Sequence, residues 1–155
     1  MNRNLQLAYL AGLIDGEGCF SVSSSEGKVK ARLEVSMTDA GVIKWAHDTF
    51  GGTTFKQERR AAWEEIHTWR LSKREELRKL TEELLPFFRT KRLAAIIVLE
   101  FCTKFPSPPK GYSLPEETKQ EMQKYCDFIS VANGRGRGSA ERKVEFLRLL
   151  EGGAA

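Results

Sequence analysis

Hydrophobic and polar residues alternate most regularly between residues 19 and 35. In the second half of this segment every other residue is apolar, namely Val29, Ala31, Leu33 and Val35. Charged residues occupy the positions between them. A period of two is typical of a β-strand with one face in the core and the other in solvent. Residues 19–25 and 29–35 are therefore predicted to form a β-hairpin around a Glu26-Gly27 turn, with one polar and mostly basic face.

Helical patterns flank this hairpin on both sides. Residues 5–15 are apolar nearly all round and lead into a glycine-rich stretch, so we expect a buried helix that Asn4 caps. After the hairpin, Thr38 or Asp39 is expected to cap a second helix, which Gly51-Gly52 ends. The first elements are thus predicted to be helix, strand, strand and helix.

A second, less regular hairpin follows the second helix. Its strands are predicted at residues 53–58 and 66–71, joined by a polar stretch. Thr68 and Arg70 are expected to face outward beside Lys56.

The rest of the chain is predicted to be helical. Ser72 and Glu75 have the spacing of a capping box, ahead of a helix that ends near Pro86. Two further helices are predicted at residues 93–105 and 115–132, and Ser139 is expected to cap a short final one.

These elements predict an α+β fold with the order αββαββα, followed by additional C-terminal helices. A length of 155 residues fits one domain. We expect its core at about residues 5–105 and a C-terminal helical extension at about residues 106–155.

Composition adds a class of partner and a location. The net charge of +4 and the pI of about 9.0 favour a polyanion without identifying one. Residues 1–20 lack the pattern of a signal peptide, and no apolar run is long enough to span a membrane. We therefore expect a protein of the cytoplasm, nucleoid or an organelle matrix that is neither secreted nor membrane-bound.

The glycines and acids at the end of the first helix need a reason of their own. Gly12 and Gly16 are four residues apart, so they expose one stripe of backbone to close approach by another helix. Asp15 and Glu17 lie at the negative end of the helix dipole, where a carboxylate is unfavourable. A bound cation would resolve that conflict.

The nine residues Leu10-Ala11-Gly12-Leu13-Ile14-Asp15-Gly16-Glu17-Gly18 resemble the signature of the LAGLIDADG homing endonucleases. The resemblance covers about residues 5–105. It implies that the sheet is a curved antiparallel saddle over the DNA major groove. It also implies that the motif helices of two units pack together at a twofold axis, through Leu10, Gly12, Leu13 and Gly16.

The resemblance further implies a metal-dependent nuclease. Glu17 matches the acidic residue that binds the catalytic divalent ion, Mg²⁺ with Mn²⁺ as a possible substitute, and the Gly16 carbonyl is a further ligand. Asp15 is expected to be structural. Lys91 matches a lysine close to the metal site that supports the phosphate or positions water. Since the chain carries one motif, a homodimer that cuts both strands of a long, near-palindromic DNA site is expected.

One position departs from the family pattern. Where relatives often place a water-positioning glutamine, this chain has Met37, which cannot hydrogen-bond a water usefully. That role is then absent, or belongs to Ser36 or Thr38. The departure leaves open an RNA-binding maturase, or a DNA-binding regulator that does not cleave.

The outward faces of both hairpins are expected to contact DNA, because a β-ribbon fits the major groove and cationic or polar side chains read base edges. The predicted contact residues on these faces are Ser21, Ser23, Ser25, Lys28, Lys30, Arg32, Glu34, Lys56, Thr68 and Arg70. The loop residues Arg59, Arg60, Arg135 and Arg137 are predicted to bind phosphates.

Overall fold

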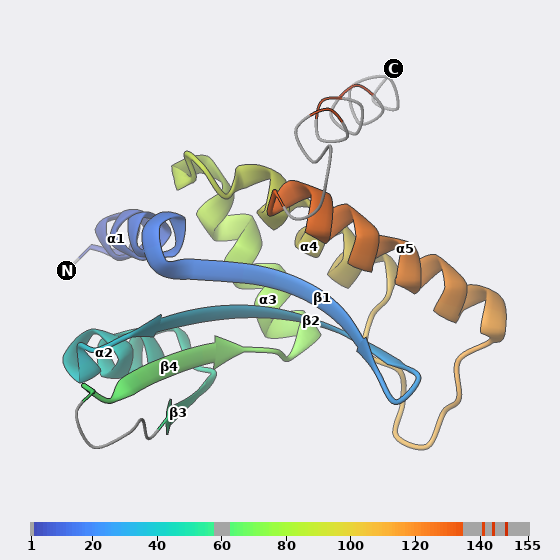
Figure 1. Ribbon diagram of the computed structural model, residues 1–155, viewed down its shortest axis with the longest axis horizontal. Coiled ribbons are helices and arrows are strands. Elements are labelled where there is room, and N and C mark those ends of the chain that lie inside the picture. Colours follow the sequence, from blue (N-terminus) through green and yellow to red (C-terminus); the bar gives the residue numbers. More distant parts are fainter. Residues whose placement is uncertain (1, 58–62, 135–140, 142–143, 145–147, 149–155) are drawn as a thin grey trace.

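The computed structural model describes residues 2–57 and 63–134, and single residues at 141, 144 and 148. Its elements follow the predicted order, αββαββα, with two more helices after it (Figure 1). The helix predicted after Ser139 lies outside the residues described. None of the described helices is both long and apolar enough to cross a membrane.

Helix α1 (Arg3–Glu17) begins two residues earlier than predicted, and its N-cap is Asn2 rather than Asn4. The Asn2 side chain accepts a hydrogen bond from the Asn4 backbone, which satisfies one of the free amides of the first turn. Burial is confined to the stripe formed by Leu7, Leu10, Ala11 and Ile14. The expectation that α1 is buried all round is therefore wrong for a single subunit.

The first hairpin consists of β1 (Gly18–Ser25) and β2 (Lys28–Met37), and its alternating burial confirms the period-two prediction. Both turn residues have positive φ, 53° at Glu26 and 73° at Gly27, as tight hairpin turns require. Helix α2 (Ala40–Phe50) follows, with Asp39 as its N-cap and Gly51 at its end.

The second hairpin consists of β3 (Thr53–Gln57) and β4 (Ile66–Leu71). Helix α3 (Arg74–Leu84) comes next and runs into a 3₁₀ turn, η1 (Leu85–Phe87). The predicted capping box is absent: the N-cap of α3 is Lys73, and its side chain makes no capping hydrogen bond.

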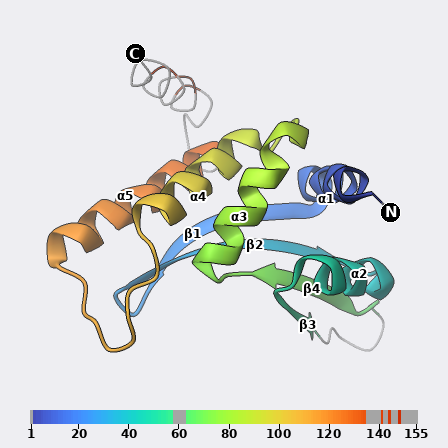
Figure 2. The same ribbon diagram turned by 180° about the vertical axis from the view of Figure 1, so that it is seen from behind.

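The four strands form one antiparallel sheet in the order β1-β2-β4-β3. Its inner face is covered by helices, among which α3 crosses in front of the strands in Figure 2. The core is built from buried residues of this face and of the helices, with Phe20, Trp69 and Phe101 among its largest side chains. The opposite face of the sheet carries the polar residues of the alternation.

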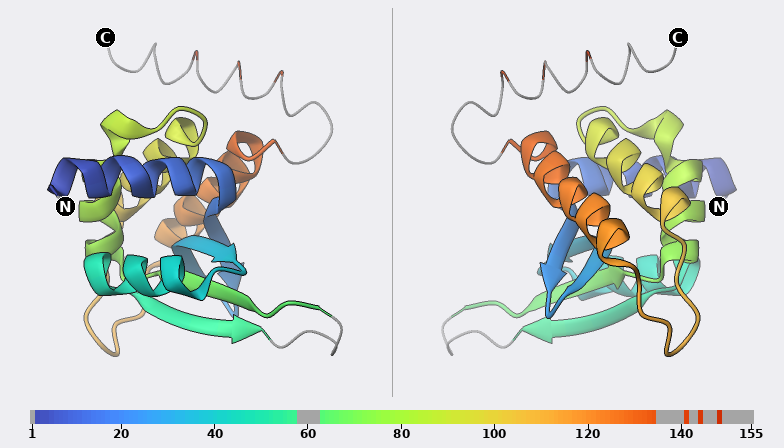
Figure 3. Two further views of the ribbon diagram at one scale, coloured as in Figure 1. Left: turned by 90° about the vertical axis from the view of Figure 1, so that its left-hand side faces the viewer. Right: turned by 90° about the vertical axis from the view of Figure 1, so that its right-hand side faces the viewer.

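Two helices complete the described chain, α4 (Arg92–Lys104) and α5 (Glu116–Ala132). Helix α5 lies beside β1 and α4 (Figure 3), and it buries Met122, Tyr125 and Ile129. At its end, the Asn133 side chain donates a hydrogen bond of 2.9 Å to the Phe20 carbonyl of β1. The C-terminal helix is thereby tied to the strand that follows α1.

Candidate active site and nucleic-acid interface

The last turn of α1 passes directly into β1 without a loop. Gly18 makes this possible, because a Cβ at that position would lie 2.7 Å from the Ile14 Cα and would force the backbone to move. Glu17 therefore sits at the junction of helix and strand, at one end of the outer sheet face, and its side chain is exposed.

Asp15 joins this junction to the start of α4. Its carboxylate accepts hydrogen bonds from three consecutive backbone amides, those of Arg89, Thr90 and Lys91, at 2.8 to 3.1 Å. It also accepts one from the Thr90 hydroxyl at 3.0 Å. Burial raises the pKa of Asp15, but these hydrogen bonds together bring the pKa below its ordinary value. The contacts agree with the structural role expected of this residue.

The backbone of Lys91 is consequently held at Asp15 in the last turn of α1, although the two residues are far apart in the sequence. Its backbone amide is 2.8 Å from the Asp15 Oδ1 atom, and Asp15 is two residues from Glu17. A cavity lies at this point between the end of α1, the Thr90–Lys91 turn and the end of α5 at Asn133. The C-terminal extension therefore forms one wall of the cavity, which the sequence did not indicate.

The donors at the end of α1 fit a hard divalent cation. The last carbonyls of a helix have no partner within it, and that of Gly16 belongs to this group. Magnesium prefers such oxygen ligands and is usually bound through one or two carboxylates together with substrate phosphates. The described residues contain no cluster of three metal-ligating side chains. One subunit thus offers the Glu17 carboxylate and the Gly16 carbonyl, and substrate oxygens would have to complete the coordination.

The exposed side of α1 is apolar and bare. A Cβ at Gly12 or Gly16 would meet no atom within 4 Å. Leu5 and Tyr9 on this helix are 61% and 49% exposed. The placement of Leu10 in a subunit interface is wrong, because Leu10 is 0% exposed in the core of its own chain. Leu13 is only partly buried against the core.

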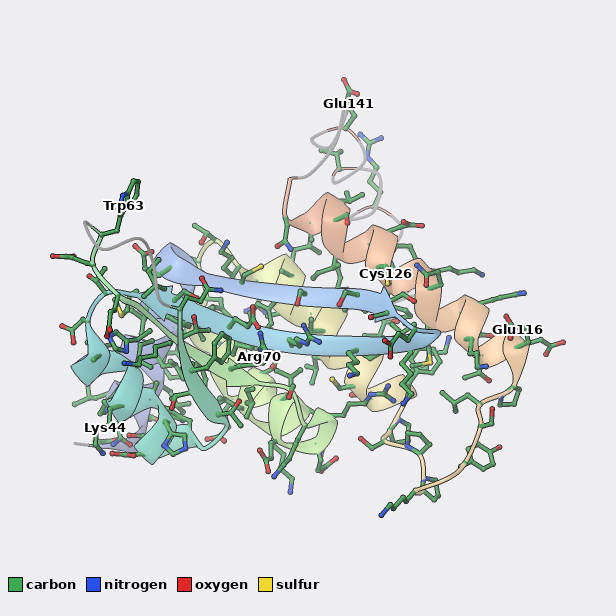
Figure 4. All side chains as sticks on the ribbon, turned by 60° about the horizontal axis from the view of Figure 1, so that its bottom comes forward. Lys44, Trp63, Arg70, Glu116, Cys126 and Glu141 are labelled. Carbon is green, nitrogen blue, oxygen red and sulfur yellow. The ribbon has the colours of Figure 1, made fainter. Side chains whose placement is uncertain are left out.

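The outer face of β1 and β2 carries the predicted polar residues in register. Ser21 lies opposite Arg32, Ser23 opposite Lys30, and Ser25 opposite Lys28. In Figure 4 this face is turned toward the viewer, and the side chains of β1 and β2 stand out from it. Among the described residues, Lys28, Lys30 and Arg32 form no ion pair, so their charge is available to a polyanion.

Two predicted contacts, Lys56 and Thr68, are changed by the second hairpin. Lys56 lies opposite His67, on the inner side of the sheet and next to α2, so it does not stand beside Arg70 as expected. Thr68 does face outward, but it is 3% exposed and its hydroxyl is 2.7 Å from that of Ser36, so it is buried against its neighbours instead of being open to DNA. Arg59 and Arg60, like Arg135 and Arg137, lie outside the residues described.

Glu34 is not a free side chain either. Its carboxylate accepts a hydrogen bond from the Nε atom of Arg70, directly opposite on β4. Arg70 in turn lies over the ring of Phe55, with 4.4 Å between its Cζ atom and the ring centroid. Phe55 was missed because no alternation marks the short strand β3, and only its register shows that it faces outward.

Met37 points away from the outer face. It lies opposite His67 and packs against the core, so it cannot hold a water next to a bound phosphate. Both alternatives are exposed: the Ser36 hydroxyl is hydrogen-bonded to that of Thr68, and Thr38 lies just after the end of β2.

The chain belongs to the LAGLIDADG endonuclease family, whose model matches residues 10–101 and thus more than half of its length. No curated protein matches the chain. Among solved structures, it is similar to the homing endonuclease I-CvuI in complex with its target, with a TM-score of 0.68 and 22% identity over 86% of this chain and 85% of that one.

Two further homing endonucleases have the same fold. I-TnaI has a TM-score of 0.63 and 20% identity, with 92% of this chain and 95% of that chain covered. I-GzeII, solved in complex with a DNA target, has a TM-score of 0.61 and 12% identity over 88% of this chain. The match covers 48% of I-GzeII, so this chain corresponds to about half of that longer relative.

Proposed function

We propose that the chain is one subunit of a homodimeric, site-specific DNA endonuclease that uses a divalent metal ion and cuts both strands of a long, near-palindromic site. The observation that carries this proposal is the exposed Glu17 carboxylate at the end of α1. It lies two residues after Asp15, whose carboxylate holds the Lys91 backbone by a hydrogen bond. A carboxylate at the negative end of a helix is unfavourable by itself and becomes favourable beside a cation.

The donor set and the relatives both support a divalent cation at Glu17. Structures of I-CvuI with DNA were obtained with 2 mM Ca and with 2 mM Mg. Glu17 and the Gly16 carbonyl would hold the Mg²⁺ ion at a DNA phosphate, and the chemistry that it would supply there is activation of a water and stabilisation of the leaving oxygen. Mn²⁺ has similar ligand preferences and is the expected substitute. Lys91 would add a positive charge beside the phosphate.

Two subunits are needed for a cut on each strand. This chain has one α1 and one Glu17, and the bare stripe at Gly12 and Gly16 gives a second α1 room to approach closely. A twofold dimer presents the same contacts to two half-sites, and its target is therefore near-palindromic. The basic outer faces of the two sheets would lie in the major groove of each half-site.

The direct test is cleavage of a randomised duplex library with Mg²⁺, with and without EDTA, followed by sequencing of the cut ends. Metal-dependent cuts at one long, near-palindromic sequence are the expected result. Glu17→Gln should abolish cutting and retain binding to that sequence. Glu117→Gln, which removes the same charge from an exposed position on α5, is the matched control and should cut normally.

The position of Met37 favours one alternative, in which the fold binds nucleic acid without cutting DNA. The chain would then act as an RNA maturase or as a DNA-binding regulator. Tight RNA binding with no metal-dependent nicking of any DNA supports the maturase. Binding of one DNA sequence without nicking supports the regulator.

A further inference from the structure

A row of four residues crosses the outer face of the sheet near its Glu17 end. Cys19, Glu34, Arg70 and Thr53 lie opposite one another on β1, β2, β4 and β3. Of the charged residues on this face, Glu34 and Arg70 are the ones that contact each other. Their side chains are 30% and 32% exposed, so the pair is partly desolvated and still reachable from outside.

Arg70 is held on two sides. The Glu34 carboxylate accepts a hydrogen bond from the Arg70 Nε–H group, and the Arg70 Cζ atom lies 4.4 Å from the centroid of the Phe55 ring. An arginine has many rotamers, and fixing it before binding removes an entropic cost that a free side chain meets on contact with DNA. Ser36 and Thr68 lie opposite each other, two residues along β2 and β4 from Glu34 and Arg70, and their hydroxyls are hydrogen-bonded to each other.

The Glu34 contact leaves the two terminal amino groups of Arg70 for an outside partner. Paired N–H donors of an arginine match the N7 and O6 acceptors of guanine in the major groove. One oxygen of the Glu34 carboxylate is already occupied by the hydrogen bond from Arg70. Arg70 also differs from Lys28, Lys30 and Arg32, which have no ion-pair partner among the described residues and can follow either a base or a phosphate.

We propose that Arg70 is a preorganised guanine reader and that Glu34 and Phe55 are positioning residues that hold it, an inference that rests on the proposed function. The sequence suggested instead that Glu34 reads a base of its own. Because this row lies nearer to α1 than the hairpin tip does, the guanine belongs to the inner part of each half-site, closer to the twofold axis than the bases near Lys28.

The test uses the full-length protein and the DNA site selected from the random library, with every base pair of one half-site varied in turn. Binding of each duplex is measured for the wild type and for Arg70→Lys, Glu34→Gln and Phe55→Leu. Arg70→Lys should reduce the preference for guanine at one base pair by about 10-fold to 100-fold, because a lysine cannot make the paired contact.

Glu34→Gln should weaken the preference at that same base pair by about fivefold and leave the other positions unchanged, since a neutral amide holds the guanidinium less firmly. Added to Arg70→Lys, it should cause no further loss. Phe55→Leu removes the ring and keeps an apolar side chain, and it should act on the same base pair. Glu76→Gln is the matched control: it breaks an ion pair with Lys73 on α3, off the sheet face, and should change no preference.

Two results would overturn the inference. One is a Glu34→Gln variant that alters the preference at a different base pair from Arg70→Lys, because Glu34 would then read its own base. The other is an unchanged preference in both Glu34→Gln and Phe55→Leu. If Glu34→Gln does not fold, judged by circular dichroism, Phe55→Leu decides alone. A wild-type protein that selects no DNA sequence contradicts the proposed function instead, and the two failures are thus distinguishable.

Discussion

At the residue scale, Asp15 does the most to bring distant parts of the chain together. The structure gives it four hydrogen-bond donors, three of them backbone amides that precede α4. A carboxylate is an acceptor only, and it suits a pocket that contains only donors. The amide of an asparagine would direct its own N–H groups at some of them.

Asp15→Asn should therefore lower the free energy of unfolding by about 1–3 kcal/mol, the usual cost of leaving buried or partly buried donors unsatisfied. Urea denaturation at neutral pH measures this loss. Asp127→Asn, an exposed acid on α5, is the control and should change little. An Asp15→Asn variant as stable as the wild type would show that the hydrogen bonds of Asp15 contribute nothing to stability.

The same carboxylate predicts a dependence on pH. The pKa of Asp15 is lowered from 3.8 in the folded chain, so the folded state favours the charged form. The resulting stability is present above pH 3.8 and is lost as the pH falls through the lowered pKa. The difference between wild type and Asp15→Asn should accordingly shrink in acid. A constant difference down to pH 2 would contradict the assignment.

At the element scale, the strength of the alternation decided how much could be predicted. In β2, every second residue from Val29 to Val35 is apolar, and all four are buried as expected. In β3 the sequence Thr-Thr-Phe-Lys-Gln has no such pattern, so its register could not be read. The face of Lys56 was therefore assigned wrongly, and Phe55 was missed as the support of Arg70.

Which side of α1 is buried could not be predicted from the sequence either. Residues 5–15 are apolar on every side, and only the packing of the chain shows that Leu10 faces inward whereas Tyr9 faces outward. The candidate metal residues could be predicted because a motif marks them. The wall that α5 adds to the cavity could not, since contacts between segments so far apart leave no local pattern.

Helix α5 gives a prediction of its own at Asn133. Asn133→Ala removes the donor to the Phe20 carbonyl and should cost about 1 kcal/mol of stability. In this variant, the amide hydrogens in the last turn of α5 should exchange faster than in the wild type, while those of α4 should exchange at the wild-type rate. The reason is that the end of α5 loses its hydrogen bond to β1. Asn4→Ala is the control, since that exposed side chain supports no other element. Unchanged exchange in α5 would mean that its apolar packing alone holds it.

At the scale of the whole molecule, the basic faces predict a strong dependence on salt. The proposed dimer would bring two copies of Lys28, Lys30 and Arg32 to the DNA. If these side chains contact about six phosphates, raising the salt concentration from 50 to 200 mM should weaken binding about a thousandfold. Fluorescence anisotropy with a labelled duplex measures this slope.

Lys28→Ala should reduce the slope by about two, one for each subunit, if these lysines contact phosphates. Lys124→Ala, an exposed lysine on α5, should leave the slope unchanged. Equal slopes for Lys28→Ala and the wild type would remove the hairpin tip from the phosphate contacts.

The proposed dimer would pack through the exposed stripe of α1 at Gly12 and Gly16. The Cβ of a leucine at Gly12 would meet no atom of the single chain within 4 Å, whereas the larger side chain would keep a second α1 at a distance. Gly12→Leu should thus fold normally by circular dichroism, while light scattering gives a mass of 17.6 kDa instead of twice that value. Since each subunit supplies one Glu17, cutting of both strands should be lost. Lys124→Leu places the same side chain on α5 and should remain dimeric. A Gly12→Leu protein that still dimerises would place the interface on another face, and the pairing of the two active sites would have to be sought there.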